Sequence, residues 1–193
     1  MSARQTIKAI AFGLCVMLVS PLILLARLEQ HAWGGEACFG LLAQLLAPMP
    51  GMPGSYLRSA YYFGTLKQCS WETHIGYGSI FTHREGSLGA RASMGAYCVF
   101  GHANIGAETM IGSRVSIPSG KRQHLDDSGG LSSETRLDLV TVGAHTWVGE
   151  GAIIMADVGE RCIVSAGAVV VKEMPSHTVI GGNPARVLKT MNQ

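Results

Sequence analysis

Residues 88–117 read LGARASMGAYCVFGHANIGAETMIGSRVSI, and a large apolar residue recurs there at six-residue intervals, mostly with glycine directly after it. One step of five separates Phe100 from Ile105, and a later step of four separates Ile154 from Val158. The leading residues of the series are Leu88, Met94, Phe100, Ile105, Ile111, Ile117, Val142, Val148, Ile154, Val158, Val164 and Val170.

A period of six fits neither a helical face, which repeats near 3.6 residues, nor an alternating strand. It fits a parallel β-helix in which each hexad supplies one short strand and one tight corner, and three hexads close a coil. Corners favour Gly or Asn-like residues. A Gly-rich helical bundle is the alternative, but each helical Gly costs about 1 kcal/mol.

Small residues lie four places after most of these leading residues, which predicts two inward positions per hexad. They are Ala92, Cys98, Thr109, Val115, Thr146, Ala152, Cys162 and Ala168.

The composition of the 193 residues excludes some classes of function. Charged residues make up 15% and the net charge is +2, which does not suggest a nucleic-acid-binding surface. The five cysteines are odd in number and lack CxxC spacing, so we expect reduced thiols. Packing explains Cys98 and Cys162 without a role as nucleophile.

The N-terminal segment is apolar. Residues 9–26 carry no charge and are flanked by Arg4 and Lys8 on one side and Arg27 on the other. The run is slightly shorter than the roughly 20 residues that a spanning helix needs, and Pro21 would kink it. A cleaved signal peptide is an alternative, but no small-x-small cleavage site follows directly. Basic residues on both flanks favour a re-entrant or in-plane helix over residues 1–32, anchored from the cytoplasmic face.

The rest of the chain divides into three further parts. Residues 33–70 are expected to form a helical cap on the first coil or a membrane-apposed helix pair. Residues 71–180 form the β-helix, interrupted by residues 119–138, a polar Gly/Ser-rich stretch that must leave the coil as a loop. Residues 181–193 are expected to form a tail with a short C-terminal helix.

Three histidines are candidates for chemistry at the loop. Counting three hexads per coil places His83, His102 and Ser119 on one face, and the loop bearing His124 leaves from that face. A general base needs one imidazole positioned on a hydroxyl, whereas zinc needs three ligands with orienting partners. No HxxxxH spacing is present, and no metal is expected.

The hexads, the loop with His124 and the run VSAGAVVVKEMPSHTVIGGNPARVLK at residues 164–189 resemble the hexapeptide-repeat acyltransferases. The resemblance covers residues 75–189 and implies left-handed coils, homotrimers with active sites between neighbouring solenoids, and acetyl-CoA as co-substrate. The tighter step IIMADVGERC at residues 153–162 and the hydrophobic N-terminus look more like the acyltransferases of bacterial surface-polysaccharide synthesis.

The resemblance also implies roles for single residues. His124 matches the general base, His83 falls at the acceptor pocket with a catalytic role, and His102 and Asp126 are expected to contact the acceptor. Cofactor contacts are expected from Trp147, Glu150, Ala166, Val171, Lys172, Arg186 and Lys189. Val171 departs from the family's Thr and lacks its hydroxyl.

The function implied is an O-acetyltransferase acting on a sugar or lipid-linked polysaccharide precursor, at the cytoplasmic face of a bacterial inner membrane. N-acylation of an amino-sugar is an alternative. A zinc-binding, carbonic-anhydrase-like β-helix and a non-catalytic one are two others.

Overall fold

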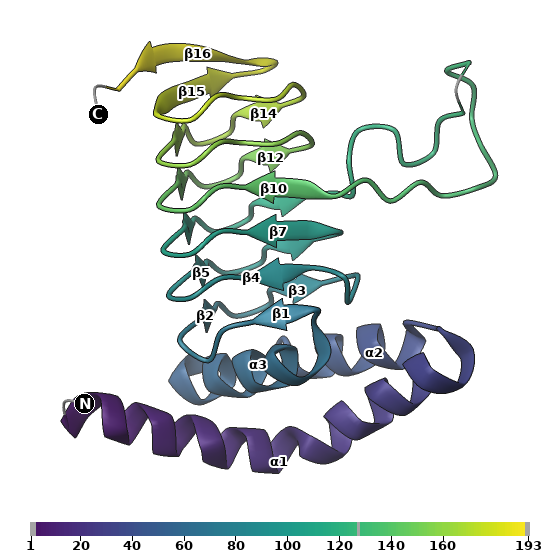
Figure 1. The fold of residues 1–193 in the computed structure, drawn as a ribbon, viewed down its shortest axis with the longest axis vertical. Coiled ribbons are helices and arrows are strands. Elements are labelled where there is room, and N and C mark those ends of the chain that lie inside the picture. The colour runs from purple at the N-terminus through teal and green to yellow at the C-terminus, as the bar shows by residue number, and fades with distance from the viewer. Residues whose placement is uncertain (1–2, 127, 192–193) are drawn as a thin grey trace.

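The computed structural model describes residues 3–126 and 128–191, and it shows a stack of short strands standing on a base of helices (Figure 1). The helices are α1 (Ala3–Trp33), α2 (Ala37–Leu46) and α3 (Gly51–Thr65). The strands are β1 (Gln68–Cys69), β2 (His74–Ile75), β3 (Ile80–Phe81), β4 (Ser87–Leu88), β5 (Ser93–Met94), β6 (Val99–Phe100), β7 (Ala103–Ile105), β8 (Met110–Ile111), β9 (Ser116–Ile117), β10 (Val140–Val142), β11 (Trp147–Val148), β12 (Ile153–Ile154), β13 (Ile163–Val164), β14 (Val169–Val170), β15 (Thr178–Gly182) and β16 (Ala185–Thr190).

The strands form three sheets, one along each side of a three-sided solenoid. Sheet A has the order β1-β4-β7-β10, sheet B the order β16-β15-β13-β11-β8-β5-β2, and sheet C the order β14-β12-β9-β6-β3. All pairs are parallel except β15 with β16. The all-β solenoid predicted from the six-residue period is confirmed.

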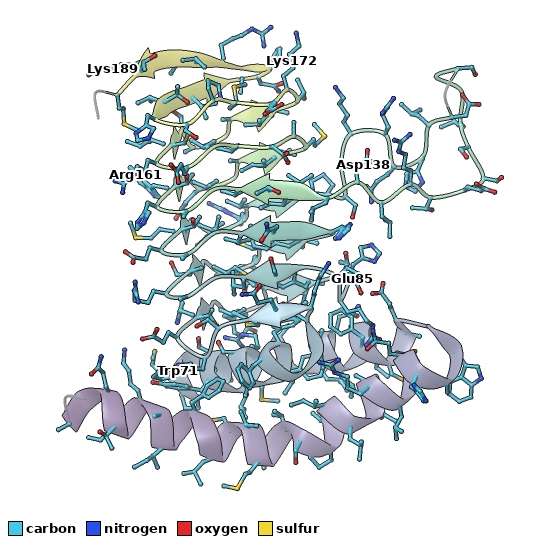
Figure 2. The ribbon with its side chains drawn as sticks, in the orientation of Figure 1. Trp71, Glu85, Asp138, Arg161, Lys172 and Lys189 are labelled. Atoms are coloured by element: carbon cyan, nitrogen blue, oxygen red, sulfur yellow. The ribbon has the colours of Figure 1, made fainter. Side chains whose placement is uncertain are left out.

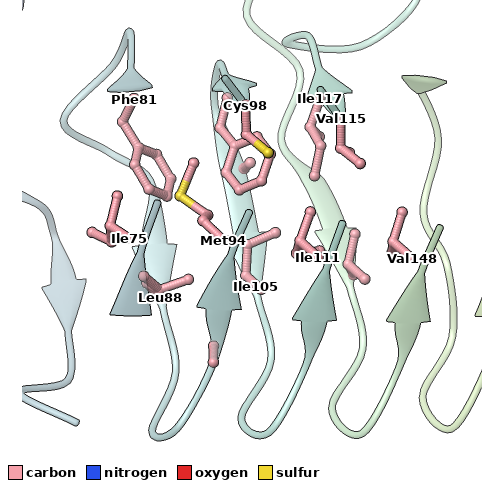
Figure 3. Packing of buried hydrophobic residues seen from close by; sticks show 14 of the residues in the cluster. Ile75, Phe81, Leu88, Met94, Cys98, Ile105, Ile111, Val115, Ile117 and Val148 are labelled. Carbon is pink, nitrogen blue, oxygen red and sulfur yellow. The ribbon is translucent and has the colours of Figure 1, made fainter. Parts of the chain in front are cut away.

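The solenoid core contains the two predicted rows of side chains. Every leading residue from Leu88 to Val170 is buried, and so are the eight small residues that follow them. Figure 3 shows some of these side chains, from Leu88 to Val148, stacked along the inside of successive coils. Because each coil repeats the same inward positions, the core is a column that depends on neighbouring coils for burial.

The corners differ in composition from the expectation of Gly or Asn. Among the described residues, seven non-glycine residues have a positive φ, and they are Arg91, Tyr97, Glu108, Arg114, His145, Arg161 and His177. Left-handed backbone costs such residues roughly 1–2 kcal/mol each. Hydrogen bonds between stacked corners offset this cost, as where Tyr97 N donates to Tyr77 O at 2.8 Å and Arg114 N donates to Ala96 O at 2.8 Å.

Glycine is required where consecutive coils approach most closely. A Cβ on Gly95 would lie 2.6 Å from the carbonyl carbon of Gly112 in the next coil. Since both groups are backbone, neither can move aside, and this explains why glycine follows so many of the leading residues.

Helices α2 and α3 cover the open end of the first coil. The buried Tyr62 hydroxyl accepts a hydrogen bond from Phe81 N at 2.9 Å, and Tyr61 donates to Phe39 O at 2.9 Å. The rings of Tyr62 and Phe81 pack edge to face at 5.3 Å. The aromatic residues of α3 therefore continue the solenoid core into the helical base.

Helix α1 lies under this base, across the end of the solenoid (Figure 1). It continues through Pro21, which has no N–H to donate to the Met17 carbonyl. The Ser20 hydroxyl donates to that carbonyl instead, at 2.8 Å. The freed backbone oxygen is thus satisfied within the helix, as an apolar environment requires.

The C-terminal helix predicted for residues 181–193 is wrong for the described part of that segment. Residues Ala185–Thr190 form strand β16, which pairs antiparallel with β15 and places Gly182 opposite Ala185. The Asn183–Pro184 turn reverses the chain directly after β15. Pairing with the last free edge satisfies backbone groups of that edge, which a helix would leave open.

Residues 119–138 leave the stack and return as a projecting arm (Figure 1). At its base, Asp138 N donates to Ser119 O at 3.1 Å, and the chain re-enters the coil at Val140.

Candidate active site

One corner of the solenoid carries the predicted histidines. It joins sheet C to sheet A and contains residues 82–86, 101–102, 118–139, 155–157 and 171–173; we call it the arm corner. In β3, β6 and β9, Phe81, Phe100 and Ile117 are in register. His83 and His102, each two residues further on, therefore lie on adjacent coils at the arm corner.

His102 is followed in the next coil by Ser119, the first residue of the arm. Ser119 is fully buried, and its Oγ accepts a hydrogen bond from His102 N at 2.8 Å. This bond fixes the backbone of the second coil against the base of the arm. The arm thus starts from a rigid point directly beside His102.

His83 has a carboxylate partner that the sequence did not suggest. Its Nδ1 lies 2.7 Å from Oε2 of Glu36, a residue in the short linker between α1 and α2. The side chains are 25% and 30% exposed, so the pair is partly open to solvent. A separation of 47 positions, with no shared motif, gives no signal for this contact in the sequence.

A polar hollow of about 380 Å³ lies beside the arm corner, on the outward face of sheet A. Its lining is rich in hydrogen-bonding groups and consists of Lys67, Gln68, Glu85, Ser87, His102, Asn104 and Leu139. Figure 2 shows Glu85 below the arm and Asp138 on the arm above it. His102 is the predicted acceptor residue that this hollow includes.

His124 is on the projecting arm. Its backbone oxygen accepts from Ser132 N at 2.9 Å, but among the described residues its imidazole makes no hydrogen bond or ion pair. Within one chain the structure therefore places His83 and His102 on adjacent coils and does not join His124 to either of them.

Asp126 organises the tip of the arm. Its carboxylate accepts from the Ser128 hydroxyl at 2.6 Å, from Gly130 N at 2.8 Å and from Ser128 N at 2.9 Å. The Ser128 hydroxyl and these backbone N–H groups lower the pKa of the Asp126 carboxyl. In this chain, Asp126 serves to close a turn.

The predicted cofactor residues fall into separate groups. Val171 and Lys172 are at the arm corner, and Lys121 Nζ of the arm donates to Val171 O at 3.4 Å. Trp147 is 53% exposed on sheet B. Glu150 and Ala166 belong to the corner that joins sheets B and C, where Glu150 forms an exposed ion pair with Arg114 at 3.6 Å.

The basic residues of the C-terminal end also lie apart. Figure 2 shows Lys172 and Lys189 on opposite sides of that end. Arg186 donates from Nη1 to the Ala185 carbonyl, at 2.9 Å within its own turn. One chain therefore does not bring all the predicted phosphate-binding residues together.

The cysteines fit a role in packing. All five are free, and Cys69, Cys98 and Cys162 are buried. Burial raises the pKa of the Cys69 thiol to about 12 and also raises that of Cys98. In the part of the chain that the structure describes, no group of three or more His, Cys, Asp or Glu residues could hold a metal ion.

The sequence of the chain is similar to parts of known acetyltransferases. No protein-family model matches the chain. Serine acetyltransferase 2 of Arabidopsis thaliana is 34% identical over 97 residues, which is 46% of this chain and 27% of that protein. WbbJ of Escherichia coli K12, named for lipopolysaccharide biosynthesis O-acetyl transfer, is 32% identical over 98 residues, 46% of this chain and 50% of WbbJ. The chain thus spans half or less of the length of these relatives.

Two solved structures share the fold. A maltose O-acetyltransferase of Clostridium difficile 630 has a TM-score of 0.67 at 22% identity, over 80% of this chain and 86% of the other. A hexapeptide-repeat acetyltransferase of Vibrio cholerae, solved with acetyl coenzyme A, has a TM-score of 0.68 at 19% identity over the same shares. The two structures show that the fold is shared, and the sequence identity with the acetyltransferases of Arabidopsis and Escherichia coli supports the hexapeptide-repeat acyltransferase family.

Proposed function

We propose that the protein is an O-acetyltransferase that moves the acetyl group of acetyl-CoA to a hydroxyl of a sugar or polysaccharide precursor. The observation that carries this proposal is the arm corner. There, His83 and His102 lie on adjacent coils, and the arm with His124 starts directly beside them. The relatives named for acetyl transfer support the reaction class.

The chemistry needs one imidazole as a general base and no covalent enzyme intermediate. The imidazole accepts the hydroxyl proton as the acceptor oxygen attacks the thioester carbonyl. A C–O bond forms, the C–S bond breaks, and the imidazolium returns its proton to the thiolate of coenzyme A. His124 is the proposed base, and the buried thiols are not needed.

We place the complete site between chains of a homotrimer. The cofactor residues Trp147, Glu150 and Ala166 lie away from the arm corner, and the arm extends away from its own solenoid. An arm that reaches a neighbouring solenoid would bring His124 of one chain to the coils of another. The separate groups of predicted residues then become parts of one site.

The acceptor class is supported by the hollow at sheet A. Amide, hydroxyl, imidazole, carboxylate and ammonium groups line it, from residues such as Asn104, Ser87 and His102. Groups of this kind donate to and accept from several hydroxyls at once. We therefore assign a polyhydroxylated acceptor to this hollow.

We further propose that α1 holds the protein on a membrane. It contains the segment Gln5–Trp33, which is long and apolar enough to cross a bilayer. One side packs inward through Phe12, Val19 and Ala26. The other, which we call the apolar face of α1, exposes Ile7, Ile10, Leu14, Met17, Leu18, Leu24, Leu25 and Leu28. So large an apolar surface is rare on a soluble protein and fits lipid.

An in-plane helix accounts for the packing better than a spanning one. Helix α1 lies across the end of the solenoid, and α3 lies between them (Figure 1). If α1 stood normal to the bilayer, charged residues near it, such as Glu72 and Arg91, would enter hydrocarbon at a cost of several kcal/mol. Lying flat, it keeps the solenoid in water. We place the solenoid on the cytoplasmic side of a bacterial inner membrane, where acetyl-CoA is available.

The activity is tested by transfer from acetyl-CoA labelled in the acetyl group to free glycans, lipid-linked glycans and amino-sugars. His124→Ala should abolish transfer to hydroxyl acceptors while folding is retained. His177→Asn is the matched control, because it removes an imidazole at another corner and Asn tolerates its positive φ of 59°. Transfer only to amines, or full activity of His124→Ala, would refute the proposal.

The topology is tested with a cysteine introduced at Ala3, in a variant whose Cys15 and Cys38 are replaced by alanine and whose remaining cysteines are buried. The protein is added to the outside of vesicles of phosphatidylethanolamine and phosphatidylglycerol. An in-plane helix leaves residue 3 open to a membrane-impermeant maleimide. A spanning helix protects it until the vesicles are lysed, and that result would overturn the in-plane placement.

A further inference from the structure

Glu36 holds two consecutive residues of the arm corner with its two carboxylate oxygens. Oε2 lies 2.7 Å from His83 Nδ1, and Oε1 accepts a hydrogen bond from Arg84 N at 2.8 Å. The carboxylate is thereby fixed in orientation relative to the imidazole. A surface ion pair without the second bond would lack this constraint.

The contact selects one tautomer of the neutral His83 ring. A carboxylate only accepts hydrogen bonds, so the proton between the two groups is on Nδ1. Nε2 then carries the lone pair and can accept a hydrogen bond or a proton. The same carboxylate–imidazole arrangement orients the base in hydrolases that use an Asp–His pair.

Arg84 connects Glu36 to the helical base. Arg84 is 4% exposed, and its guanidinium donates from Nη2 to Gly35 O at 2.8 Å and from Nη1 to Ala26 O at 3.2 Å. It also pairs with Glu29 of α1 at 3.3 Å, and its Nε lies 3.7 Å from Glu36 Oε1. Glu29 in turn accepts from Cys38 N at 2.8 Å, at the start of α2.

These contacts connect the C-terminal end of α1 to residues 83 and 84 of the arm corner. Lys67 and Glu85, which line the hollow beside this corner, form an exposed ion pair with each other at 3.8 Å. Among the described residues, Glu36 is the carboxylate that forms a hydrogen bond with the His83 ring.

We propose that Glu36 is a positioning residue that holds His83 with Nδ1 protonated, which leaves Nε2 free to accept a hydrogen bond or a proton at the arm corner, on the coil next to His102. The proposal rests on the proposed acetyltransferase function. Through Arg84 and Glu29, the orientation of His83 depends on the C-terminal end of the membrane-docked helix α1. The helix that binds the membrane thus also contributes to the order of the acceptor site.

The first test is spectroscopic and needs no substrate. Histidine labelled with 15N in the vesicle-bound full chain reports the tautomer of each neutral ring, and the His83 signal is assigned by its loss in His83→Gln. The wild type should show protonated Nδ1 at His83. In Glu36→Gln this signature should be lost, whereas Glu160→Gln, an exposed acid at another corner, should leave it unchanged. An unchanged His83 tautomer in Glu36→Gln refutes the proposal.

The second test is a double-mutant cycle on the transfer reaction. Glu36→Gln should lower kcat by about tenfold or more with little change in KM for acetyl-CoA. In the His83→Gln background it should have no further effect, because its role is exerted through His83. A merely structural Glu36 would give additive losses, and that outcome also refutes the proposal. If transfer fails in the wild type with every acceptor, the proposed function fails and the tautomer measurement still decides the role of Glu36.

Discussion

Arg58 of α3 and Ile75 of the first coil are joined by two hydrogen bonds, from Nε and Nη2 of the guanidinium to the Ile75 carbonyl oxygen, at 3.1 and 3.0 Å. Nη1 of the same side chain donates to the carbonyls of Met49, Ala47 and Leu46. Arg58 is 1% exposed. One buried guanidinium therefore donates to backbone carbonyls of the end of α2, of the loop after it and of the first coil. Burial lowers the pKa of Arg58, but the side chain stays charged.

Replacing Arg58 by lysine should destabilise this cap. An ammonium group cannot reproduce the planar fork, so at least one buried carbonyl is left unsatisfied, at about 1–3 kcal/mol each. We expect a loss on the order of 3 kcal/mol, measured from the urea midpoint in detergent. Arg161→Lys, on an exposed corner, is the matched control and should change the midpoint little. Equal midpoints for the two variants would show that the fork is not required.

His74 should make the stability of the same region depend on pH. Its Nδ1 lies 2.9 Å from Ser55 Oγ, and that oxygen already accepts from Ile75 N at 3.2 Å. The neutral ring can form this contact in either direction, whereas the protonated, charged ring loses the option of accepting from the hydroxyl. Burial, and then the charge of Arg58, lower the pKa of His74 below its usual value of about 6.5.

The direction in which pH changes the free energy of unfolding follows from proton binding to His74 in the folded and unfolded chains. The unfolded chain binds a proton at His74 more readily than the folded chain does, because the pKa of His74 is lower in the folded state. The contribution of His74 to stability is therefore complete above about pH 6.5, and it is lost as the pH falls toward the lower pKa of the folded state. In wild type, the urea midpoint should fall over that range. His74→Gln should show a smaller fall. If the urea midpoint falls equally with pH in wild type and in His74→Gln, His74 does not cause the pH dependence.

The sequence carried most of the information about the solenoid. Leu88, Met94 and Ile111 are predictable as core because every coil repeats the same inward position. The positive φ of Arg91 and Glu108 was not predictable, because their conformation is imposed by bonds between stacked corners rather than by local preference. Residues 185–190 have a helix-like composition, yet they form β16 because an open sheet edge lies beside them.

The candidate site was predictable only where it follows the repeat. Counting hexads placed His83 and His102 at one corner, since register is a property of the coil. Glu36 could not be found this way, because its position depends on how α1 and α2 pack on the first coil. The role of His124 stays a prediction, since its imidazole has no partner within the described residues of one chain.

The apolar face of α1 gives a direct prediction about membranes. Leu18 is 70% exposed, and replacing it by glutamate places a charge where lipid contact is proposed. Binding to vesicles of phosphatidylethanolamine and phosphatidylglycerol, measured by flotation, should weaken on the order of tenfold or more. Leu131→Glu is the matched control, because Leu131 is 88% exposed on the arm, away from α1. Equal binding by both variants would contradict the assignment of this face to lipid.

Lys172 is expected to meet a phosphate of the coenzyme, and this contact can be separated from recognition of the rest of the molecule. Lys172→Gln removes one cation at the arm corner. The KM for acetyl-CoA should rise about three- to tenfold, as loss of one partly exposed charge contact allows. The KM for acetyl-pantetheine, which lacks the nucleotide and its phosphates, should not change.

The comparison of the two thioesters decides what Lys172 does. Arg161→Gln is the control for a general loss of positive charge, because Arg161 lies on the other side of the solenoid from Lys172 in Figure 2. A rise in KM for both thioesters after Lys172→Gln would indicate a disturbed coil instead of a lost phosphate contact. If Lys172→Gln leaves the KM values for acetyl-CoA and acetyl-pantetheine unchanged, Lys172 does not contact the coenzyme. In that case the basic residues of β16, Arg186 and Lys189, would have to supply the phosphate contacts from a neighbouring chain.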